Sequence, residues 1–419
     1  MKLPTFLRGV RARSGAALPG AAVFAMAGFG AGAAAGRRSR AALRPYDLGL
    51  VLVVTGLVLF GVVMVFSASI ALTDSPRYHV SPTYFLVRHV VSLFIALAVS
   101  ALAFTVPLST WQRLAPLIFA AATVLLLAVL IPGVGKGALG ARRWIGFGGL
   151  NLQPSEVMKF ACVLYAADFT VRKQDYMHDA AKGFLPMAIV MLVVGLLLLL
   201  EPDLGAFGVV VSISMGILFL GGVNGRLFAG ISVALALGFM AVIATSPWRR
   251  ERMFAYLDPW ASENVLGRGY QLTQSLIAFG RGEWFGVGLG AGVEKLHYLP
   301  EAHTDFLMSV IGEELGMAGV LVVVAAFYWI VRRAFEIGRQ AIALDRTYAG
   351  LVAQGVGMWI GLQAFINIGV ATGLLPTKGL TLPLMSYGGS ALMGSLVSLT
   401  VLLRVDFENR ILMRGGTTR

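Results

Sequence analysis

Residues 48–72 read LGLVLVVTGLVLFGVVMVFSASIAL, a run without a single charged side chain. A helix of about 20 apolar residues crosses the roughly 30 Å hydrocarbon core of a bilayer, so this run predicts a transmembrane helix. Three further runs are equally free of charge, and they cover residues 183–200, 348–375 and 380–403. The chain is therefore predicted to cross a membrane several times.

The composition of the 419 residues agrees with this class. Hydrophobic residues make up 57% and charged residues only 13%, whereas soluble domains carry about 25% charged residues. The formal net charge of +13 would suit a nucleic-acid partner, but Lys and Arg lie mainly in tails and short loops, as cytoplasmic anchors do. We expect no nucleic-acid partner. The single cysteine, Cys162, lies in an apolar segment and excludes an intrachain disulfide.

We predict an all-α polytopic membrane protein of about ten transmembrane helices. The expected spans cover residues 48–72, 90–107, 115–131, 155–171, 183–200, 204–223, 227–246, 305–331, 348–375 and 383–403. The distribution of Lys and Arg places both termini in the cytoplasm. Residues 1–46 are then a cytoplasmic tail, 47–404 the transmembrane domain and 405–419 a second cytoplasmic tail.

Two segments qualify this topology. Residues 247–304, between the seventh and eighth spans, form a long periplasmic loop rich in Gly, Trp and charge. Residues 16–36 are uncharged but mostly Ala and Gly, so we interpret them as a flexible or interfacial part of the tail and not as an eleventh span.

Polar residues at membrane depth are costly and therefore informative. The fourth span opens with Gln153-Pro154-Ser155-Glu156 and has Lys159 one turn later. Glu156 and Lys159 are spaced to pair on one helix face. This pattern suits either a neutralised helix start or a substrate site.

Two outward turns carry further candidates. Arg142, Arg143 and Trp144 lie in the loop before the fourth span, where they would bind a pyrophosphate or anchor the loop at the interface. Glu201 and Asp203 occupy the tight turn between the fifth and sixth spans. These carboxylates would hold a divalent cation, Mg or Mn, or simply end the helices.

The sharpest candidate is the segment YLPEAHTDF, residues 298–306, at the end of the long loop. Thr304 or Asp305 would cap the following helix, whose dipole would keep the carboxylate ionised, the form that a general base requires. His303 is either a substrate contact or a hydrogen-bonding residue of the loop end. The eighth span then carries Glu313 and Glu314.

The connection between the ninth and tenth spans offers donors for an anion. It contains Lys378, Ser386 and the pair Gly388-Gly389, where backbone and hydroxyl groups can approach a ligand closely. A packing patch of small residues is the alternative interpretation. The glycine-rich stretches at 133–137 and 286–292 lack nucleotide-binding spacing, and no His/Cys cluster has zinc spacing, so we expect no nucleotide cofactor.

The motifs taken together resemble one protein family. GARRWI, QPSE, EPDLG, DPW, GYQLTQSLIAFGRGEWFGVGLG, YLPEAHTDF, IGEELG and LTLPLMSYGGS occur in this order. This order resembles the SEDS family (shape, elongation, division and sporulation proteins) over roughly residues 46–410, and the wording is closer to its division members than to its elongation members. Leu204 and Ala391 depart from the family pattern, but neither change removes a charged or hydroxyl group at Asp203, Ser386 or Ser390.

The resemblance implies a ten-span glycosyltransferase that polymerises lipid II into peptidoglycan for septal wall synthesis, with Asp305 as the essential acid. It also implies a class B penicillin-binding protein, other divisome membrane proteins and the growing lipid-linked glycan as partners, in the bacterial inner membrane at the septum. Asp305 would act as the base, with cationic groups or a divalent cation offsetting the pyrophosphate charge. A lipid II flippase, an elongation-type polymerase and a structural scaffold are the alternatives.

Overall fold

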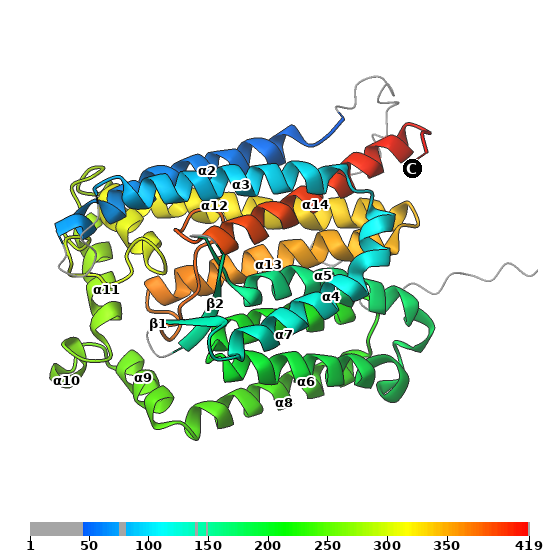
Figure 1. The fold of residues 1–419 in the computed structure, drawn as a ribbon, viewed down its shortest axis with the longest axis horizontal. Coiled ribbons are helices and arrows are strands. Elements are labelled where there is room, and N and C mark those ends of the chain that lie inside the picture. Colours follow the sequence, from blue (N-terminus) through cyan, green and yellow to red (C-terminus); the bar gives the residue numbers. More distant parts are fainter. Residues whose placement is uncertain (1–44, 75–80, 139–140, 148–149, 418–419) are drawn as a thin grey trace, which may run out of the picture.

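The computed structural model describes residues 45–74, 81–138, 141–147 and 150–417, and Figure 1 shows their arrangement. Residues 16–36, interpreted from the sequence as tail, lie outside the described residues. The long helices run side by side in one bundle, with the small sheet and three short helices towards one end.

Each predicted span corresponds to a helix, although the boundaries differ in several cases. The long helices are α2 (Leu48–Ser69), α3 (Tyr84–Thr105), α4 (Leu108–Leu130), α5 (Pro154–Arg172), α6 (Leu185–Leu200), α7 (Leu204–Leu220), α8 (Gly225–Ala244), α12 (Leu307–Ala343), α13 (Thr347–Ala371) and α14 (Gly389–Met413). Within the described part of the chain, 8 helices are long and apolar enough to cross a membrane, and α7 is a shorter apolar helix. The remaining predicted span corresponds to α5, which is not among these eight helices because its charged residues lower its mean hydropathy. The protein is an all-α polytopic membrane protein, as predicted.

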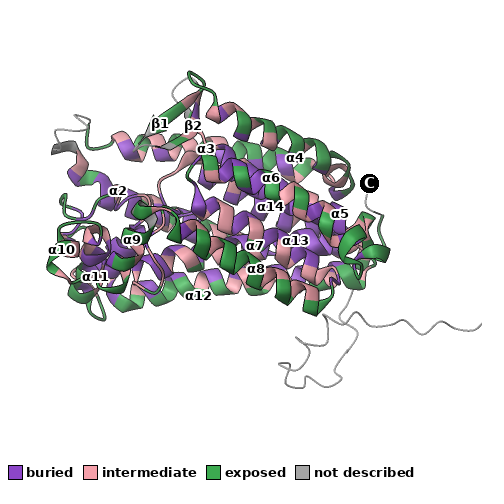
Figure 2. Ribbon diagram, turned by 90° about the horizontal axis from the view of Figure 1, so that it is seen from below, coloured by how far each residue is buried: buried purple, intermediate pink, exposed green. Residues whose placement is uncertain are grey.

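Helices α12 and α13 pack against each other along much of their length. A Cβ on Gly338 of α12 would lie 2.9 Å from the main-chain oxygen of Gly350 on α13, so the small side chains let the two backbones approach. Helix α13 also packs against α5, α7 and α14, and the residues near its centre are almost all buried (Figure 2). Helix α13 is buried because other helices surround it, and its small residues let them approach closely.

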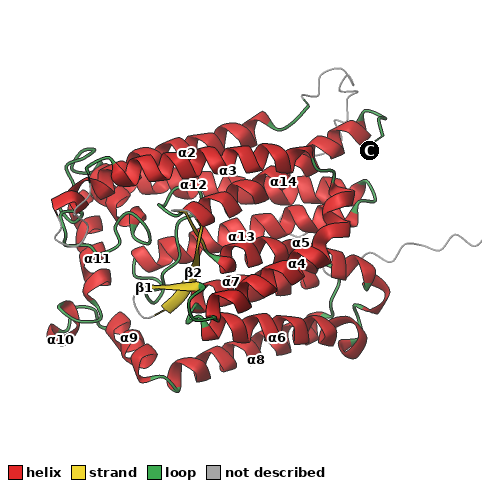
Figure 3. Ribbon diagram, in the orientation of Figure 1, coloured by secondary structure: helices red, strands yellow, loops and turns green. Residues whose placement is uncertain are grey.

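A small antiparallel sheet was not predicted. It consists of β1 (Gly135–Ala138), β2 (Ala141–Phe147) and β3 (Leu150–Leu152), in the order β1-β2-β3. Figure 3 shows these strands beside the helices, towards the end of the bundle that lies away from the C-terminus. The strands are short and glycine-rich, so they show neither the alternation of apolar and polar residues nor the β-branched residues from which strands are predicted.

The predicted long loop, 247–304, is partly helical. It contains α9 (Pro247–Leu257), α10 (Ser262–Val265) and α11 (Tyr270–Gly282), which lie at the left of Figure 1, away from the C-terminus. We call this end of the bundle the loop end. Asp47, before α2, accepts a hydrogen bond from Arg333, whose Nη2 lies 3.9 Å from Asp406 on α14. Asp47 and Asp406, near the two ends of the described chain, therefore lie together at the opposite end of the bundle.

Several helix boundaries differ from the predicted spans. Helices α3 and α4 begin earlier, at Tyr84 and Leu108 and not at 90 and 115, and α14 begins later, at Gly389 and not at 383. Two helices also end later than predicted. Helix α12 continues to Ala343, well beyond the predicted end at 331, and α14 runs on to Met413, inside the segment predicted as the C-terminal tail. Ion pairs account for both extensions, since Arg333 pairs with Glu336 at 2.8 Å and Arg410 with Asp406 at 2.7 Å. Charged turns beyond the apolar core thus stay helical because they satisfy one another.

Candidate active site at the loop end

Asp305 lies in a compact turn just before α12. The main-chain oxygen of Glu301 accepts hydrogen bonds from the N–H groups of Thr304 at 3.2 Å, Asp305 at 3.1 Å and Phe306 at 3.3 Å. Glu301 itself has a φ of 57°, in the left-handed region that side chains other than glycine seldom adopt. Strain of this kind persists where the surrounding structure holds the turn, and it gathers at functional sites.

The prediction that Thr304 or Asp305 caps the helix is wrong. The N-cap is Phe306, without a side-chain capping bond in the described structure, and Thr304 Oγ1 donates instead to Glu301 Oε2 at 2.9 Å. The Asp305 backbone is held from α13, where Asn367 Nδ2 donates to the main-chain oxygens of Asp305 at 2.7 Å and Leu380 at 2.6 Å. The Asp305 side chain is therefore not used as a cap.

Charges of both signs act on the Asp305 carboxyl. Burial, together with the negative charges of Glu301 and Asp203, raises its pKa from 3.8 to about 7, and the positive charges of Arg143 and Arg252 act against this rise. The expectation that the carboxylate stays fully ionised is thus corrected, because desolvation outweighs the opposing influences. A carboxyl with a pKa near neutrality is well matched to general-base catalysis.

Arg143 connects the sheet to the turn between α6 and α7. On β2, its Nε donates to the main-chain oxygen of Glu201 at 3.1 Å. The Glu201 carboxyl is fully buried, and its two oxygens have no hydrogen-bond partner among the described residues. Burial and the nearby Asp203 raise the pKa of Glu201 to about 8, with Arg143 opposing the shift.

Asp203 is the hub of a second set of contacts. Its Oδ1 accepts from Ala206 N at 3.1 Å and so caps α7. Its Oδ2 accepts from Ser155 Oγ at 3.2 Å and from Gln153 Nε2 at 3.3 Å. The start of α5 therefore lies beside Asp203. Pro154 occupies the first turn of that helix, as predicted.

A closed metal cage is not formed by these acids. Among the residues that the structure describes, no group of three or more His, Cys, Asp or Glu could hold a metal ion. Both Asp203 oxygens already accept hydrogen bonds, whereas both Glu201 oxygens are open. One or two carboxylates fit Mg²⁺ only when substrate phosphates and water complete its coordination.

The connection between α13 and α14 closes the site from another side. Arg252 on α9 donates from Nε to Thr377 Oγ1 at 2.9 Å, and burial lowers the pKa of this guanidinium while Asp305 acts in the opposite direction. A Cβ on Gly379 would lie 2.9 Å from Asp305 Oδ2, so this glycine lets the loop pass directly beside the carboxyl group.

Lys378 lies at the edge of an apolar groove. Its Nζ is 5.5 Å from the centre of the Phe239 ring on α8. Phe239 lines a groove of about 330 Å³ formed by α6, α7 and α8, whose other walls include Leu204 and Phe207. A cation therefore lies where an apolar groove approaches the polar site.

Glu156 and Lys159 are paired but enclosed. Lys159 Nζ is 2.7 Å from Glu156 Oε1 and 2.7 Å from Gln363 Oε1, and the lysine side chain is 0% exposed. Gln363 in turn donates to the main-chain oxygen of Thr381 at 3.0 Å, and Trp359 donates to Gln363 at 2.9 Å. The pair therefore supports the loop after α13 from within the bundle.

The other predicted residues occupy varied positions. His303 is buried between Phe85, at 4.9 Å between ring centres, and Tyr387, at 5.4 Å. Ser386 is buried and accepts from Leu382 N at 3.0 Å, and a Cβ on Gly389 would come 3.0 Å from Ser92 Oγ on α3. Gly388 is the N-cap of α14. These residues hold α3, α14 and the turn before Asp305 together.

Arg142 and Trp144 flank Arg143 on β2. Arg142 is exposed and lies opposite Gly137, whereas Trp144 is half-buried and lies opposite Lys136. Only Arg143 of the arginine pair acts on Asp305. Four further residues of the site were not predicted from the sequence: Arg252, Glu301, Asn367 and Gly379. Glu301 is part of the YLPEAHTDF segment, whereas no local pattern marks the other three.

Fold and site together define a polytopic membrane protein with an acid–arginine site at one end of its bundle. The chain belongs to the FtsW/RodA/SpoVE family of cell cycle proteins, the SEDS family, whose pattern it matches over residues 48–411. Two of its relatives are each named probable peptidoglycan glycosyltransferase FtsW. The protein from Burkholderia thailandensis is 61% identical over 99% of this chain and 92% of its own, and that from Polynucleobacter necessarius is 58% identical over 90% of each chain.

Solved structures show the same fold. A chain of the structure named "Structural coordination of polymerization and crosslinking by a peptidoglycan synthase complex" has a TM-score of 0.69, with 29% identity over 87% of this chain and 98% of that chain. The rod shape determining protein RodA of Thermus thermophilus has a TM-score of 0.62, with 29% identity over 86% of this chain and 96% of that chain. The chain is thus FtsW-like in sequence and shares its fold with RodA.

Proposed function

We propose that Asp305 is the general base with which this protein polymerises lipid II into glycan strands at the loop end of the bundle. The relatives, at up to 61% identity over nearly the whole chain, make the protein a peptidoglycan glycosyltransferase. The single observation that carries the residue assignment is the half-buried Asp305 carboxyl, with a pKa raised to about 7 by desolvation in the presence of Arg143 and Arg252.

The proposed step forms one glycosidic bond and breaks one bond to phosphate. Asp305 takes the proton from the acceptor GlcNAc hydroxyl, whose oxygen attacks the anomeric carbon of the donor sugar. The bond from that carbon to the donor pyrophosphate breaks, and the lipid pyrophosphate leaves with the electron pair. Arg143, Arg252 and Lys378 offset the negative charge that develops on the leaving group.

The apolar groove suits the polyprenyl tail of one substrate. Its walls on α6, α7 and α8 are apolar, and Lys378 at its edge would meet the pyrophosphate that follows the tail. The sugar would then extend towards Asp305, which lies against Gly379, the neighbour of Lys378 in the chain. The tail, the pyrophosphate and the sugar follow one another along the substrate in the same order as the groove, Lys378 and the Asp305 carboxyl follow one another along the protein.

A divalent cation, Mg²⁺ or Mn²⁺, is part of the proposal. Glu201, with both oxygens open, and Asp203 would hold it together with the substrate pyrophosphate. When bound, it would supply positive charge for the leaving group. Chelation with EDTA should stop polymerisation and added Mg²⁺ or Mn²⁺ should restore it; full turnover in EDTA would remove the cation from the proposal.

Membership of the family supports a proposal for the partner and the location. A related structure is described as a peptidoglycan synthase complex that coordinates polymerization and crosslinking. We extend this to a class B penicillin-binding protein and other divisome proteins as partners of this chain, in the inner membrane at the septum. Pull-down of the full chain with a candidate transpeptidase, and imaging of a fluorescent fusion during division, test these two points.

Replacement of the base tests the central claim. Asp305→Asn keeps the size of the side chain but cannot accept the proton, so purified protein in liposomes should form no glycan ladder from lipid II, whereas wild-type protein should. Insertion and thermal unfolding of the variant should match those of a folded protein. Ladders of wild-type intensity from Asp305→Asn would refute the assignment, and headgroup transfer across the liposome without ladders would favour the flippase.

A further inference from the structure

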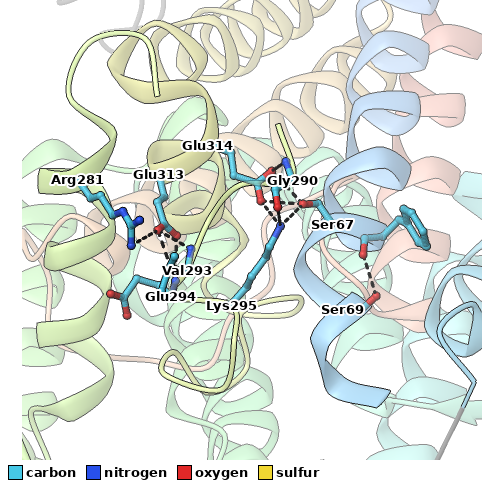
Figure 4. A network of polar contacts seen from close by, with 10 residues as sticks. Ser67, Ser69, Arg281, Gly290, Val293, Glu294, Lys295, Glu313 and Glu314 are labelled. Atoms are coloured by element: carbon cyan, nitrogen blue, oxygen red, sulfur yellow. Dashed lines mark hydrogen bonds and ion pairs between the residues drawn. The ribbon is translucent and has the colours of Figure 1, made fainter. Parts of the chain in front are cut away.

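We propose that a buried polar network of Ser67, Lys295, Glu313 and Glu314 is a positioning device for Asp305; this inference rests on the proposed function. Figure 4 shows the network, which joins α2, the loop after α11 and the beginning of α12. None of these residues contacts Asp305 directly, so each would act through the backbone that carries the base.

Helix α12 is broken near its beginning. Gly316 has φ 67° and ψ −166°, which separates the first turns, from Leu307, from the long span that follows. A Cβ at Gly316 would lie 2.5 Å from Gly286 N and from the main-chain carbon of Trp284, so only glycine fits this position. The short segment next to Asp305 is therefore not held in place by the continuous hydrogen bonding of a straight helix.

The loop after α11 forms hydrogen bonds with the backbone groups of α12 that lose their partners within the helix at the break. Met317 N donates to the main-chain oxygen of Glu283 at 2.9 Å, and Ala318 N donates to that of Trp284 at 3.1 Å. In the other direction, Val287 N donates to the oxygen of Glu313 at 3.0 Å. The loop thus holds both sides of the break, as buried backbone groups require.

Side chains fasten the same loop more specifically. Lys295 Nζ is 2.5 Å from Glu314 Oε1 and donates to Ser67 Oγ at 2.8 Å and to the main-chain oxygen of Gly290 at 2.8 Å. Ser67 Oγ also lies 2.7 Å from Glu314 Oε1. The side chains of Lys295 and Glu314 are only 2% and 0% exposed, so these bonds are shielded from water.

Glu313 completes the network on the opposite side of the segment. It accepts hydrogen bonds from Val293 N at 2.7 Å and from Glu294 N at 3.2 Å, and Arg281 Nη1 lies 3.7 Å from its carboxylate. Two consecutive glutamates thus hold the loop from both faces. An ion pair of this kind is rarely the best way to stabilise a buried site, because apolar side chains avoid the cost of desolvation.

The ion pair between Lys295 and Glu314 joins the two ends of the segment that contains Asp305. Lys295 and Glu314 are in contact, and Asp305 lies in the chain between them. Within this closed segment, Leu299 N donates to the oxygen of Glu294 at 2.7 Å, and the Glu301 turn then leads to Asp305. Both ends of the segment that presents the base are therefore fixed at one point, and a displacement of about 1 Å can lower a rate by about 100-fold.

Glu314→Gln tests the proposal, since it keeps the shape of the side chain and removes its charge. In liposomes, kcat for lipid II should fall about 10- to 100-fold while KM stays unchanged. Amide hydrogen exchange at Leu299, Asp305 and Phe306 should become faster. Asp406→Asn, which breaks a buried pair with Arg410 at the other end of the bundle, is the matched control and should alter neither kcat nor this exchange.

A double variant separates positioning from stability. Lys295→Met with Glu314→Leu replaces the ion pair by apolar side chains and should recover the thermal unfolding midpoint, but kcat should stay low. Recovery of full turnover in the double variant would overturn the proposal, as would wild-type exchange in Glu314→Gln. If wild-type protein forms no polymer at all, the proposed function fails instead, and the exchange measurement still decides whether the network holds the Asp305 segment.

Discussion

Arg143 and Glu201 are joined by a hydrogen bond of 3.1 Å, from Nε of the arginine to the main-chain oxygen of the glutamate. This bond brings a side chain of the small sheet to the turn between α6 and α7, and places a guanidinium near Asp305 and Asp203. The position of one positive charge is thus decided by two segments that are distant in the sequence.

Arg143→Gln should lower lipid II polymerisation by about 100- to 1000-fold, because one donor for the developing pyrophosphate charge is lost. The turn would also lose its hydrogen bond, so the initial rate should be compared at saturating substrate with protein of verified fold. Arg113→Gln, an exposed arginine before the middle of α4, is the matched control and should leave the rate unchanged. Equal rates for both variants would contradict the role of Arg143.

The rate of polymerisation should rise with pH through about 7. Burial raises the pKa of Asp305 to about 7, and the ionised form is the base, so the active fraction is small below this pH and large above it. Initial rates in liposomes between pH 5.5 and 8.5, on the scale set by this pKa, provide the measurement.

The same profile in Arg143→Gln offers a second comparison. Arg143 opposes the rise in the pKa of Asp305, so without it the rise in rate should move to higher pH. A profile that falls with pH, or a shift in the opposite direction, would contradict the assignment of Asp305 as the base.

Lys159→Met should destabilise the protein. It leaves Glu156 buried without its ammonium partner and removes one of the two donors to Gln363 Oε1, and loss of one partner of a buried pair costs about 3–5 kcal/mol. The thermal unfolding midpoint in detergent should fall, and Lys159→Met combined with Glu156→Gln should recover part of the loss. An unchanged midpoint with a raised KM for lipid II would show instead that Lys159 binds substrate.

Gly316→Ala should lower the free energy of unfolding by about 1–3 kcal/mol, because alanine is strained at a positive φ and its Cβ would meet the backbone at 2.5 Å. Gly56→Ala on α2 is the control, since nothing lies within 4 Å of its Cβ and alanine favours a helix. Thermal unfolding of both variants measures the difference. Equal midpoints would mean that the break in α12 tolerates a side chain.

Much of the fold could be predicted from local sequence. Long uncharged runs such as residues 48–72 indicate helices because the bilayer leaves backbone groups no other partner than their own helix. The Asp305 segment stood out for a similar reason, since polar residues beside an apolar span are costly without a function. These inferences depend on residues that are neighbours along the chain.

Other features depended on packing between distant segments. Three residues from separate segments lie near Asp305: Arg252 from α9, Asn367 from α13 and Gly379 from the loop after α13. Their spacing in the sequence does not predict that they lie near one another. Glu156 and Lys159 were predicted as a pair, but their complete enclosure follows from Gln363 and Trp359 on α13. The pairing of strands β1 to β3 also depends on the chain around them.

The sequence by itself determined the membrane-spanning helices and singled out Asp305 as the candidate acid, because hydrophobicity and the cost of polar groups are properties of single segments. Only the tertiary structure decided that this acid is desolvated within the electrostatic influence of two arginines, with a pKa raised to about 7. Desolvation and charge–charge interaction depend on distances through space, and those distances exist only after the helices have packed.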